Sequence, residues 1–171
     1  MSEVGRIEDE LRRSFGGEAY HGPALGELLA EVSAVQAAAR PIPRAHTIWE
    51  IVLHLNAWHR VIRQRLEGER IGDLQPSEDW PAVSETGTAA WRAAGRELGS
   101  EHLRLREAIL RISDRRLADD VPERSFSFYT MLHGTIQHDL YHAGQIALLK
   151  KVVGKAVQRL PQEAPTKKEV P

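Results

Sequence analysis

The sequence predicts an all-α domain, a four-helix bundle with long crossover connections and a short extra N-terminal helix. Apolar residues recur with a period of about 3.6 along most of the chain, and no segment alternates long enough to indicate a strand. Strong helix start and stop signals divide this pattern into four main helices. The length of 171 residues suits one domain. The connections are too long for a minimal up-and-down bundle.

The N-terminal region predicts one main helix followed by a short one. The first covers residues 4–15 and ends at the glycine pair 16–17. Residues 20–23 form a turn, and Pro23 suits the first position of a short helix that reaches Leu29 or further. This short helix is the extra element beside the four main ones.

The second main helix has the strongest start signal in the chain. It follows a loop that contains Pro41 and Pro43. Residues 47–50 match the T-x-x-E capping box, in which the threonine and the glutamate satisfy backbone groups of the first turn. We expect this helix to run to residue 66 or 67 and to end at Gly68.

The C-terminal half predicts two longer helices. An irregular crossover over residues 69–83 leads to a helix over residues 85–112. A connection through Val121 and Pro122 leads to the last helix, over residues 128–153, which we expect Gly154 to end. The domain therefore covers residues 1–155. The tail, residues 156–171, has too few apolar residues to fold and is predicted to be disordered.

Composition excludes several classes of function. The chain has no cysteine, so it cannot contain a disulfide, a cysteine nucleophile or a thiolate metal site. Its 23 Lys and Arg nearly balance its 24 Asp and Glu, which argues against nucleic acid or an anionic membrane as a partner. The N-terminus does not resemble a signal peptide, and no apolar run approaches the ~18 residues of a membrane span. We expect a soluble, cytoplasmic protein.

Helix geometry selects three of the eight histidines as candidate metal ligands. His138 and His142 are four residues apart, so they lie about 40° apart on one helix face, one turn above the other. His133 lies about 140° from His138 and cannot join them. His54 and His59 are also about 140° apart, and the apolar neighbours of His54 place it inward, with His59 nearer the edge.

Three neutral imidazoles with the remaining positions free describe an open, catalytic type of metal site. The segment between His138 and His142 lacks the glutamate of the H-E-x-x-H metalloprotease motif, so that mechanism loses its general base. The alternative is that these histidines are hydrogen-bonded core residues without a metal.

Three further residues are candidates for a role beside the histidines. Glu50 lies one turn before His54 and would orient it, unless the capping box alone explains it. Gln145 lies on the same face as His142 and would bond a ligand imidazole or a bound water, or fill a polar gap. Tyr141 flanks this face, as a catalytic acid or as an interior aromatic residue.

Two stretches of the chain resemble the DinB-like superfamily of small metal-binding four-helix proteins. They are TIWEIVLHL, residues 47–55, and QHDLYHAGQI, residues 137–146. The second stretch is the more specific, and its place in the last helix also matches. The spacing between the stretches and the Asp-Trp-Pro turn at residues 79–81 are similar too. The resemblance covers roughly residues 1–155.

The resemblance implies a bundle that binds one divalent ion, zinc or nickel, at the positions of His54, His138 and His142. Characterised relatives include transferases that use low-molecular-weight thiols, a thiol-dependent isomerase and hydrolases. It therefore implies a metal-dependent small-molecule transferase or hydrolase, with a low-molecular-weight thiol as a candidate cosubstrate. The alternative is a non-catalytic stress-response protein that binds metal or a small molecule.

The last helix also suggests a homodimer. Opposite its histidine face lies a second apolar stripe, formed by Ile136, Leu140, Ala143 and Ala147. A helix that is apolar on two faces must bury both or leave an exposed patch. Either a second copy of the chain covers this stripe, or the N-terminal segment or the connection around Phe126 covers it within the monomer.

Overall fold

Seven α-helices and one 3-10 helix make up the part of the chain that the structure, a computed structural model, describes: residues 2–158, with side chains for 2–154. The predicted tail, residues 156–171, lies outside the described residues except for the end of the last helix. In chain order the elements are α1 (Glu3–Gly16), α2 (Leu25–Ala30), α3 (Ala34–Ala38), α4 (Ile48–Leu66), α5 (Pro76–Asp79), α6 (Thr88–Leu110), η1 (Asp114–Ala118) and α7 (Phe128–Gln158).

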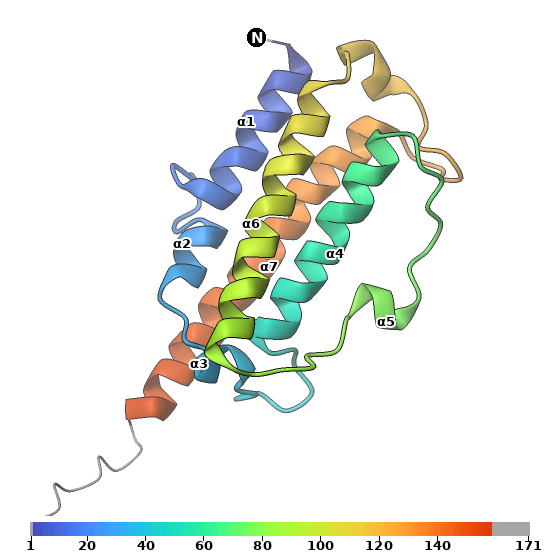
Figure 1. The fold of residues 1–171 in the computed structure, drawn as a ribbon. Coiled ribbons are helices and arrows are strands. Elements are labelled where there is room, and N and C mark those ends of the chain that lie inside the picture. Colours follow the sequence, from blue (N-terminus) through green and yellow to red (C-terminus); the bar gives the residue numbers. More distant parts are fainter. Residues whose placement is uncertain (1, 159–171) are drawn as a thin grey trace, which may run out of the picture.

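Four long helices form the body of the fold, which confirms the predicted all-α bundle. Helices α1, α4, α6 and α7 lie alongside one another (Figure 1). Helix α4 packs against α6 and α7, and α1 packs against the same two helices. The short helices α2 and α3 extend from the end of α1 and pack on α7 and α4. The long crossover between α4 and α6 contains α5, which packs on the outer side of α4 (Figure 1).

The capping box predicts the start of α4 correctly. The Glu50 backbone N–H donates to Thr47 Oγ1 at 3.1 Å, and the Thr47 N–H donates to Glu50 Oε2 at 2.8 Å. The helix ends at Leu66, and Gly68 follows with φ of 98°, a conformation that glycine adopts at little cost. Both ends of the helix that carries His54 are therefore set by local sequence.

Helices α3 and α5 are the short helices that the sequence pattern did not predict. The Pro41 loop is preceded by α3, and the crossover contains α5, with Pro76 in its first turn. Helix α2 starts at Leu25, after Ala24, and not at Pro23. Helices of four to six residues are too short to show a period of 3.6, so only their cap residues could have revealed them.

Helix α7 does not end at Gly154 as predicted but continues to Gln158. Gly154 is not among the glycines with positive φ, so it does not adopt the left-handed conformation that ends many helices. A glycine inside a helix costs about 1 kcal/mol relative to alanine. The preceding residue, Val153, is buried against the bundle, and such packing offsets a cost of this size.

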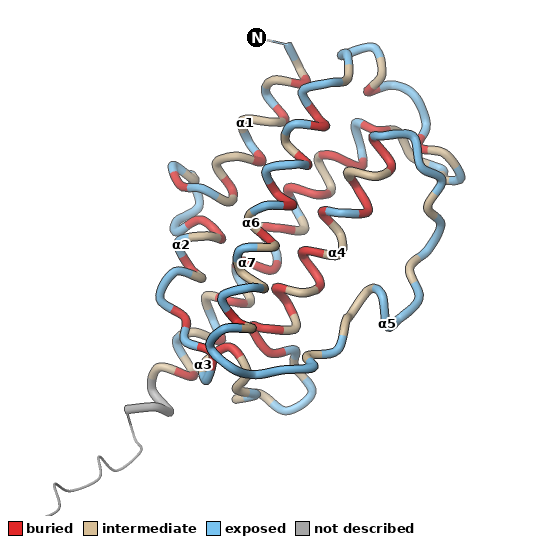
Figure 2. Tube along the Cα trace, viewed as in Figure 1, coloured by how far each residue is buried: buried red, intermediate tan, exposed pale blue. Residues whose placement is uncertain are grey.

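The core consists of two apolar clusters separated by a polar layer. One cluster lies around Ile51, Leu98 and Ile146, and the other around Ile7, Leu105 and Leu132. Along every long helix the sequence passes from one cluster to the other through a buried polar residue, namely Ser14, His59, His102 and Asp139. Figure 2 shows buried positions along the inner sides of all four helices, whereas the α5 crossover is largely exposed.

The second apolar stripe of α7 is covered within the chain. Ile136 belongs to the same cluster as Val4, Ile7 and Leu11 of α1, and Leu140 packs against that cluster. Helices α1 and α2 both contact α7. The homodimer therefore stays a prediction, without the exposed stripe that motivated it.

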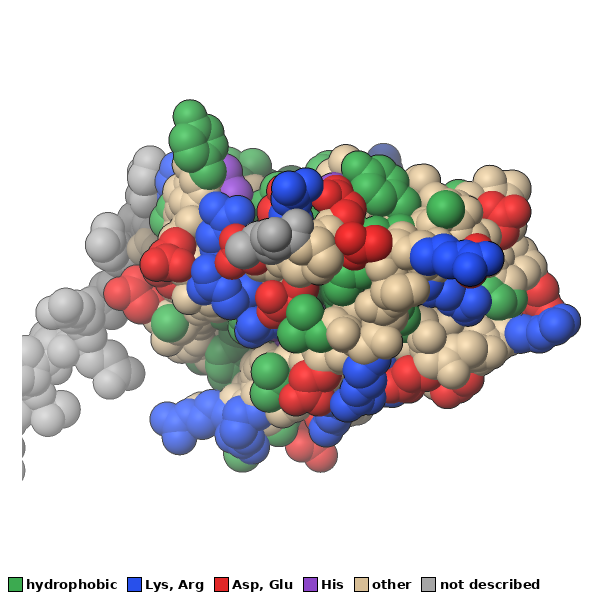
Figure 3. All heavy atoms as spheres, turned by 90° about the horizontal axis from the view of Figure 1, so that it is seen from above, with side chains coloured by type: hydrophobic (Ala, Val, Ile, Leu, Met, Phe, Trp, Pro, Cys, Tyr) green, Lys and Arg blue, Asp and Glu red, His purple; other side chains and the backbone are tan. Residues whose placement is uncertain are grey.

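No helix in residues 2–158 combines the length and the apolar character needed to cross a membrane. On the face shown in Figure 3, acidic and basic side chains are interspersed and neither sign dominates. This mixture of charges on one face agrees with the small net charge of the chain, −1.

We expect Thr47→Ala to lower the free energy of unfolding by about 1 kcal/mol, because it removes the side-chain cap of α4. Urea denaturation would measure the change. Thr88→Ala is the matched control, because Thr88 is exposed at the start of α6 and Gly87, not Thr88, is the cap residue there. Equal losses in the two variants would contradict the capping argument.

Candidate metal centre

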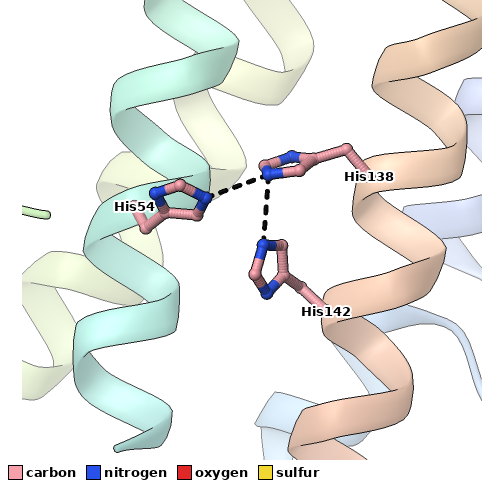
Figure 4. A group of neighbouring side chains, drawn as sticks. All are labelled: His54, His138 and His142. Atoms are coloured by element: carbon pink, nitrogen blue, oxygen red, sulfur yellow. Dashed lines mark hydrogen bonds between the residues drawn. The ribbon is translucent and has the colours of Figure 1, made fainter. Parts of the chain in front are cut away.

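Three histidine side chains from two helices converge on one point. His54 comes from α4, and His138 and His142 come from successive turns of α7 (Figure 4). His138 Nε2 lies 2.9 Å from His54 Nε2 and 3.1 Å from His142 Nε2. His54 and His142 are 5% and 4% exposed, so this group is largely removed from water. The helical-wheel argument selected these three residues.

Two of the three rings have a fixed tautomer. The Nδ1–H of His54 donates to the backbone carbonyl of Asp79 at 2.7 Å. The Nδ1–H of His142 donates to Gln145 Oε1 at 2.8 Å. Since each proton is held on Nδ1, the Nε2 atoms of His54 and His142 carry lone pairs that point at His138. Hydrogen bonds of this kind orient metal-ligating histidines.

This arrangement fits a divalent metal ion better than it fits hydrogen bonding among the rings. A proton on His138 Nε2 can satisfy the lone pair of His54 or of His142, but not both. A cation that all three Nε2 atoms coordinate would satisfy all of them. The imidazole donor set suits zinc, nickel, copper and iron. The cluster could therefore hold a metal ion through Nε2 of His54, His138 and His142.

Burial keeps the three imidazoles neutral, the form that binds metal. Desolvation lowers the pKa of His54 and of His142. For His138, desolvation and the neighbouring His142 and His54 lower the pKa to about 4. The site therefore does not have to lose protons at neutral pH before a metal binds.

The end of the α5 crossover closes the His54 side of the site. The Trp80 ring stacks on the His54 ring, with centroids 3.9 Å apart, and on the other side on the His46 ring at 3.5 Å. Asp79 Oδ1 accepts a hydrogen bond from Trp58 Nε1 at 2.7 Å and lies 3.2 Å from His54 Nδ1. The crossover thus holds His54 through a carbonyl, a carboxylate and a stacked ring.

A cavity of about 400 Å³ opens beside the histidines. His54, His138 and Asp79 form part of its wall, and apolar side chains such as Trp58 and Met131 form much of the rest. A larger hollow of about 660 Å³ lies between α2, α3 and α6, but no histidine lines it. The smaller cavity is the one that meets the candidate metal centre.

The three other candidates lie at different distances from this centre. Gln145 contacts it directly, through the bond to His142. Tyr141 is 66% exposed and places its ring edge-on to His142, with centroids 5.1 Å apart, so it is not an interior residue. Glu50 bonds Thr47 and Arg40 in the first turn of α4. The orienting role predicted for Glu50 at His54 belongs to Asp79.

A second buried group, which sequence reasoning missed, lies in the polar layer. His59 Nε2 bonds the Asp139 carboxylate at 2.9 and 3.0 Å, and both residues are essentially inaccessible to solvent. His102 is 3% exposed, stacks on Phe15 with centroids 4.2 Å apart, and makes no hydrogen bond within residues 2–154. The placement of His59 near the edge was therefore wrong, because α4 packs against α7 as well as α6 and buries both faces.

These observations define a class: a helical bundle with a three-histidine site, open to a cavity, that could hold a metal ion. The chain belongs to the DinB superfamily, whose family model matches residues 21–146. That match contains all three converging histidines and the crossover that holds His54. No curated protein and no solved structure matches the chain in the comparisons.

We expect alanine at His54, His138 or His142 to abolish most metal binding, because two imidazoles hold a divalent ion far more weakly than three. The measurement is elemental analysis of protein purified without an affinity tag. His133→Ala is the control, because His133 lies on the same helix but outside the converging group. Full metal content in His54→Ala would contradict the three-histidine site.

We expect His102 to make the metal-free protein less stable in acid. Burial is the largest cause that lowers its pKa, to about 2, and the charges of His59 and Arg106 add to it. Below pH 6.5 the unfolded chain takes up a proton at this residue and the folded protein does not, so stability is complete above pH 6.5 and falls as pH decreases.

The contribution of His102 between pH 7 and pH 5 is about 2 kcal/mol. Urea denaturation at several pH values would measure it, and His102→Leu should flatten the dependence by that amount. His21→Leu, at an exposed position, controls for the loss of one histidine. An unchanged pH dependence in His102→Leu would show that the folded protein protonates His102 freely.

Proposed function

We propose that this protein is a metal-dependent enzyme that acts on a small molecule, as a transferase that uses a low-molecular-weight thiol or as a hydrolase. The observation that carries the proposal is the cavity of about 400 Å³ whose wall includes His54 and His138. A structural metal site is closed by four protein ligands, whereas a catalytic site has three and leaves a position open to substrate. We propose zinc or nickel as the ion.

A divalent ion held by three imidazoles supplies Lewis-acid chemistry, which makes water or a thiol available as a nucleophile near neutral pH. Because the chain has no cysteine, a sulfur nucleophile has to come from a cosubstrate. Gln145 and the Asp79 carbonyl keep two of the rings in the tautomer that binds metal. The apolar wall of the cavity excludes water from the reacting groups.

We propose Asp79, a carboxylate in the cavity wall, as the group that accepts a proton in this reaction. Its Oδ1 is occupied by Trp58 Nε1 and by the contact with His54 Nδ1. Its Oδ2 makes no hydrogen bond within the described part of the chain, and the residue lines the cavity. In thiol transfer the S–C bond forms, the bond from carbon to the leaving group breaks, and the thiol proton passes to this carboxylate or to solvent.

The second candidate function is non-catalytic binding of metal or a small molecule, as in a stress-response protein. The same cavity and the same histidines support it, because neither requires turnover. The two functions differ in one measurable respect. Both predict a bound metal, but only the enzyme predicts multiple turnover.

We expect the zinc-loaded or nickel-loaded protein to conjugate cysteine, glutathione or coenzyme A to monochlorobimane, with chloride as the leaving group, or to hydrolyse p-nitrophenyl acetate. The bimane conjugate is measured by fluorescence and nitrophenolate by absorbance. Asp79→Asn keeps the backbone carbonyl that holds His54, so we expect it to retain metal and to lose about 10²-fold or more in kcat/KM. The metal-free His54→Ala protein is the blank.

Stoichiometric metal with no turnover in either assay would favour the binding protein over the enzyme. A protein that contains no stoichiometric metal when purified without a tag would overturn both functions. Equal activity in Asp79→Asn and wild type would remove Asp79 from the mechanism and leave the metal-dependent reaction standing.

A further inference from the structure

Arg65 is a buried cation in the wall of the same cavity. It is 2% exposed and lies near the C-terminal end of α4. Its Nε and Nη2 donate to the backbone carbonyls of Ile71 and Gly72 at 2.9–3.2 Å. No carboxylate among the described side chains lies within ion-pair distance of it. Its positive charge is therefore hydrogen-bonded but forms no direct ion pair with a described side chain; the nearest acidic influence is Asp73, which pairs with Arg124.

A buried guanidinium without a carboxylate partner is unusual, because desolvation of a charge is costly. Two carbonyl groups recover part of the lost hydration, but they leave the net charge in place. The neighbouring Arg124 adds positive charge, and its own partner Asp73 is exposed. Burial, followed by the charge of Arg124, lowers the pKa of Arg65, and the charge of Asp73 opposes this shift only in part.

The structural role of Arg65 explains only part of this arrangement. Its bonds to Ile71 and Gly72 fasten the start of the crossover to α4. A neutral glutamine or asparagine could make similar bonds to carbonyls without burying a charge. The remaining nitrogen, Nη1, takes no part in these bonds, and the residue forms part of the cavity wall. The cavity therefore offers a fixed positive group to whatever enters it.

The cavity wall combines a few ionisable groups with apolar side chains. Asp79, two histidines and Arg65 are its ionisable residues among the described side chains, and much of the rest is apolar, including Ile62 and Phe126. The Arg65 guanidinium lies 6.0 Å from the centre of the Trp58 ring, which also lines the cavity. A ligand that fills the cavity would contact an apolar wall along its body.

We propose that the cavity binds a small organic anion, with an apolar body and a carboxylate group that pairs with Arg65. The proposal rests on the proposed function in one respect: the part of the substrate that reacts would lie at the histidines. Because Nε and Nη2 already donate to Ile71 and Gly72, the ligand carboxylate would accept a charge-assisted hydrogen bond from Nη1.

The test uses a matched pair of probes, 3-phenylpropanoate and 3-phenylpropanamide, which differ in charge but hardly in shape. Both are small enough for a cavity of about 400 Å³. We expect isothermal titration calorimetry to give a Kd for the carboxylate about ten- to a hundredfold lower than that for the amide, the effect of charged hydrogen bonds. The titration is made with metal-free and with zinc-loaded protein, because a metal ion also attracts carboxylates.

Arg65→Gln should remove the preference for the carboxylate and leave the affinity for the amide unchanged, because glutamine can still donate to the crossover carbonyls. Arg60→Gln is the matched control on the same helix, since Arg60 is exposed and pairs with Glu97. A purely structural role of Arg65 would weaken both probes equally. If Arg65→Gln does not fold, the Nε–H signal of Arg65 in a ¹H–¹⁵N spectrum of the wild type should shift with the carboxylate only.

The outcomes separate this proposal from the proposed function. A carboxylate preference in the metal-free wild type that Arg65→Gln loses supports the anion site, whatever the activity assays show. The proposal would be overturned if the preference for the carboxylate appears only with zinc or persists in Arg65→Gln. It would also be overturned if neither probe binds at millimolar concentration. None of these results changes the metal content, which tests the three-histidine site independently.

Discussion

The hydrogen bond between His59 and Asp139 is the constraint on which the geometry of the site depends. It joins α4 to α7 inside the core, at the level where the two apolar clusters meet. Apolar packing alone tolerates small shifts of one helix along another, but a buried carboxylate has to keep its partner. Asp139 directly follows His138, and His59 lies five residues after His54. This bond fixes the position of α4 along α7 and the rotation of both helices about their axes. That geometry brings His54 towards His138 and His142.

The crossover between α4 and α6 contributes what the bundle itself lacks. Helices α4 and α7 supply the imidazoles, but the group that fixes the His54 ring is a backbone carbonyl at the end of α5, and Trp80 covers the same ring. Helix α5 is only four residues long and packs on α4. Arg65 fastens the beginning of this crossover from α4. One long connection is therefore held at both ends by the helix whose histidine it orients.

Sequence reasoning succeeded where the determinants were local and periodic. The Thr47 capping box and the long apolar periods predicted four main helices, and 100° per residue was enough to choose His54, His138 and His142. The helical-wheel argument wrongly placed His59 near the edge of the bundle. It assumes that a helix has one buried face, whereas α4 has neighbours on two sides. It could not find the role of Asp79, because a carbonyl is present at every residue and only the path of the chain brings this one to His54. The prediction that α7 ends at Gly154 was wrong because packing, and not the low helix propensity of glycine, decides where this helix ends.

Local charge at the site differs from the charge of the whole chain. The chain carries −1 with acidic and basic groups balanced, so its overall field gives no preference for an anionic or a cationic ligand. Three neutral imidazoles would not reduce the charge of a divalent ion. Among the described side chains of the cavity wall, Asp79 is the one carboxylate, and Arg65 adds a positive charge. In a cavity with an apolar wall such charges are weakly screened. Selection of an anionic ligand would therefore come from a few buried groups and would depend little on salt, unlike attraction by an exposed basic surface.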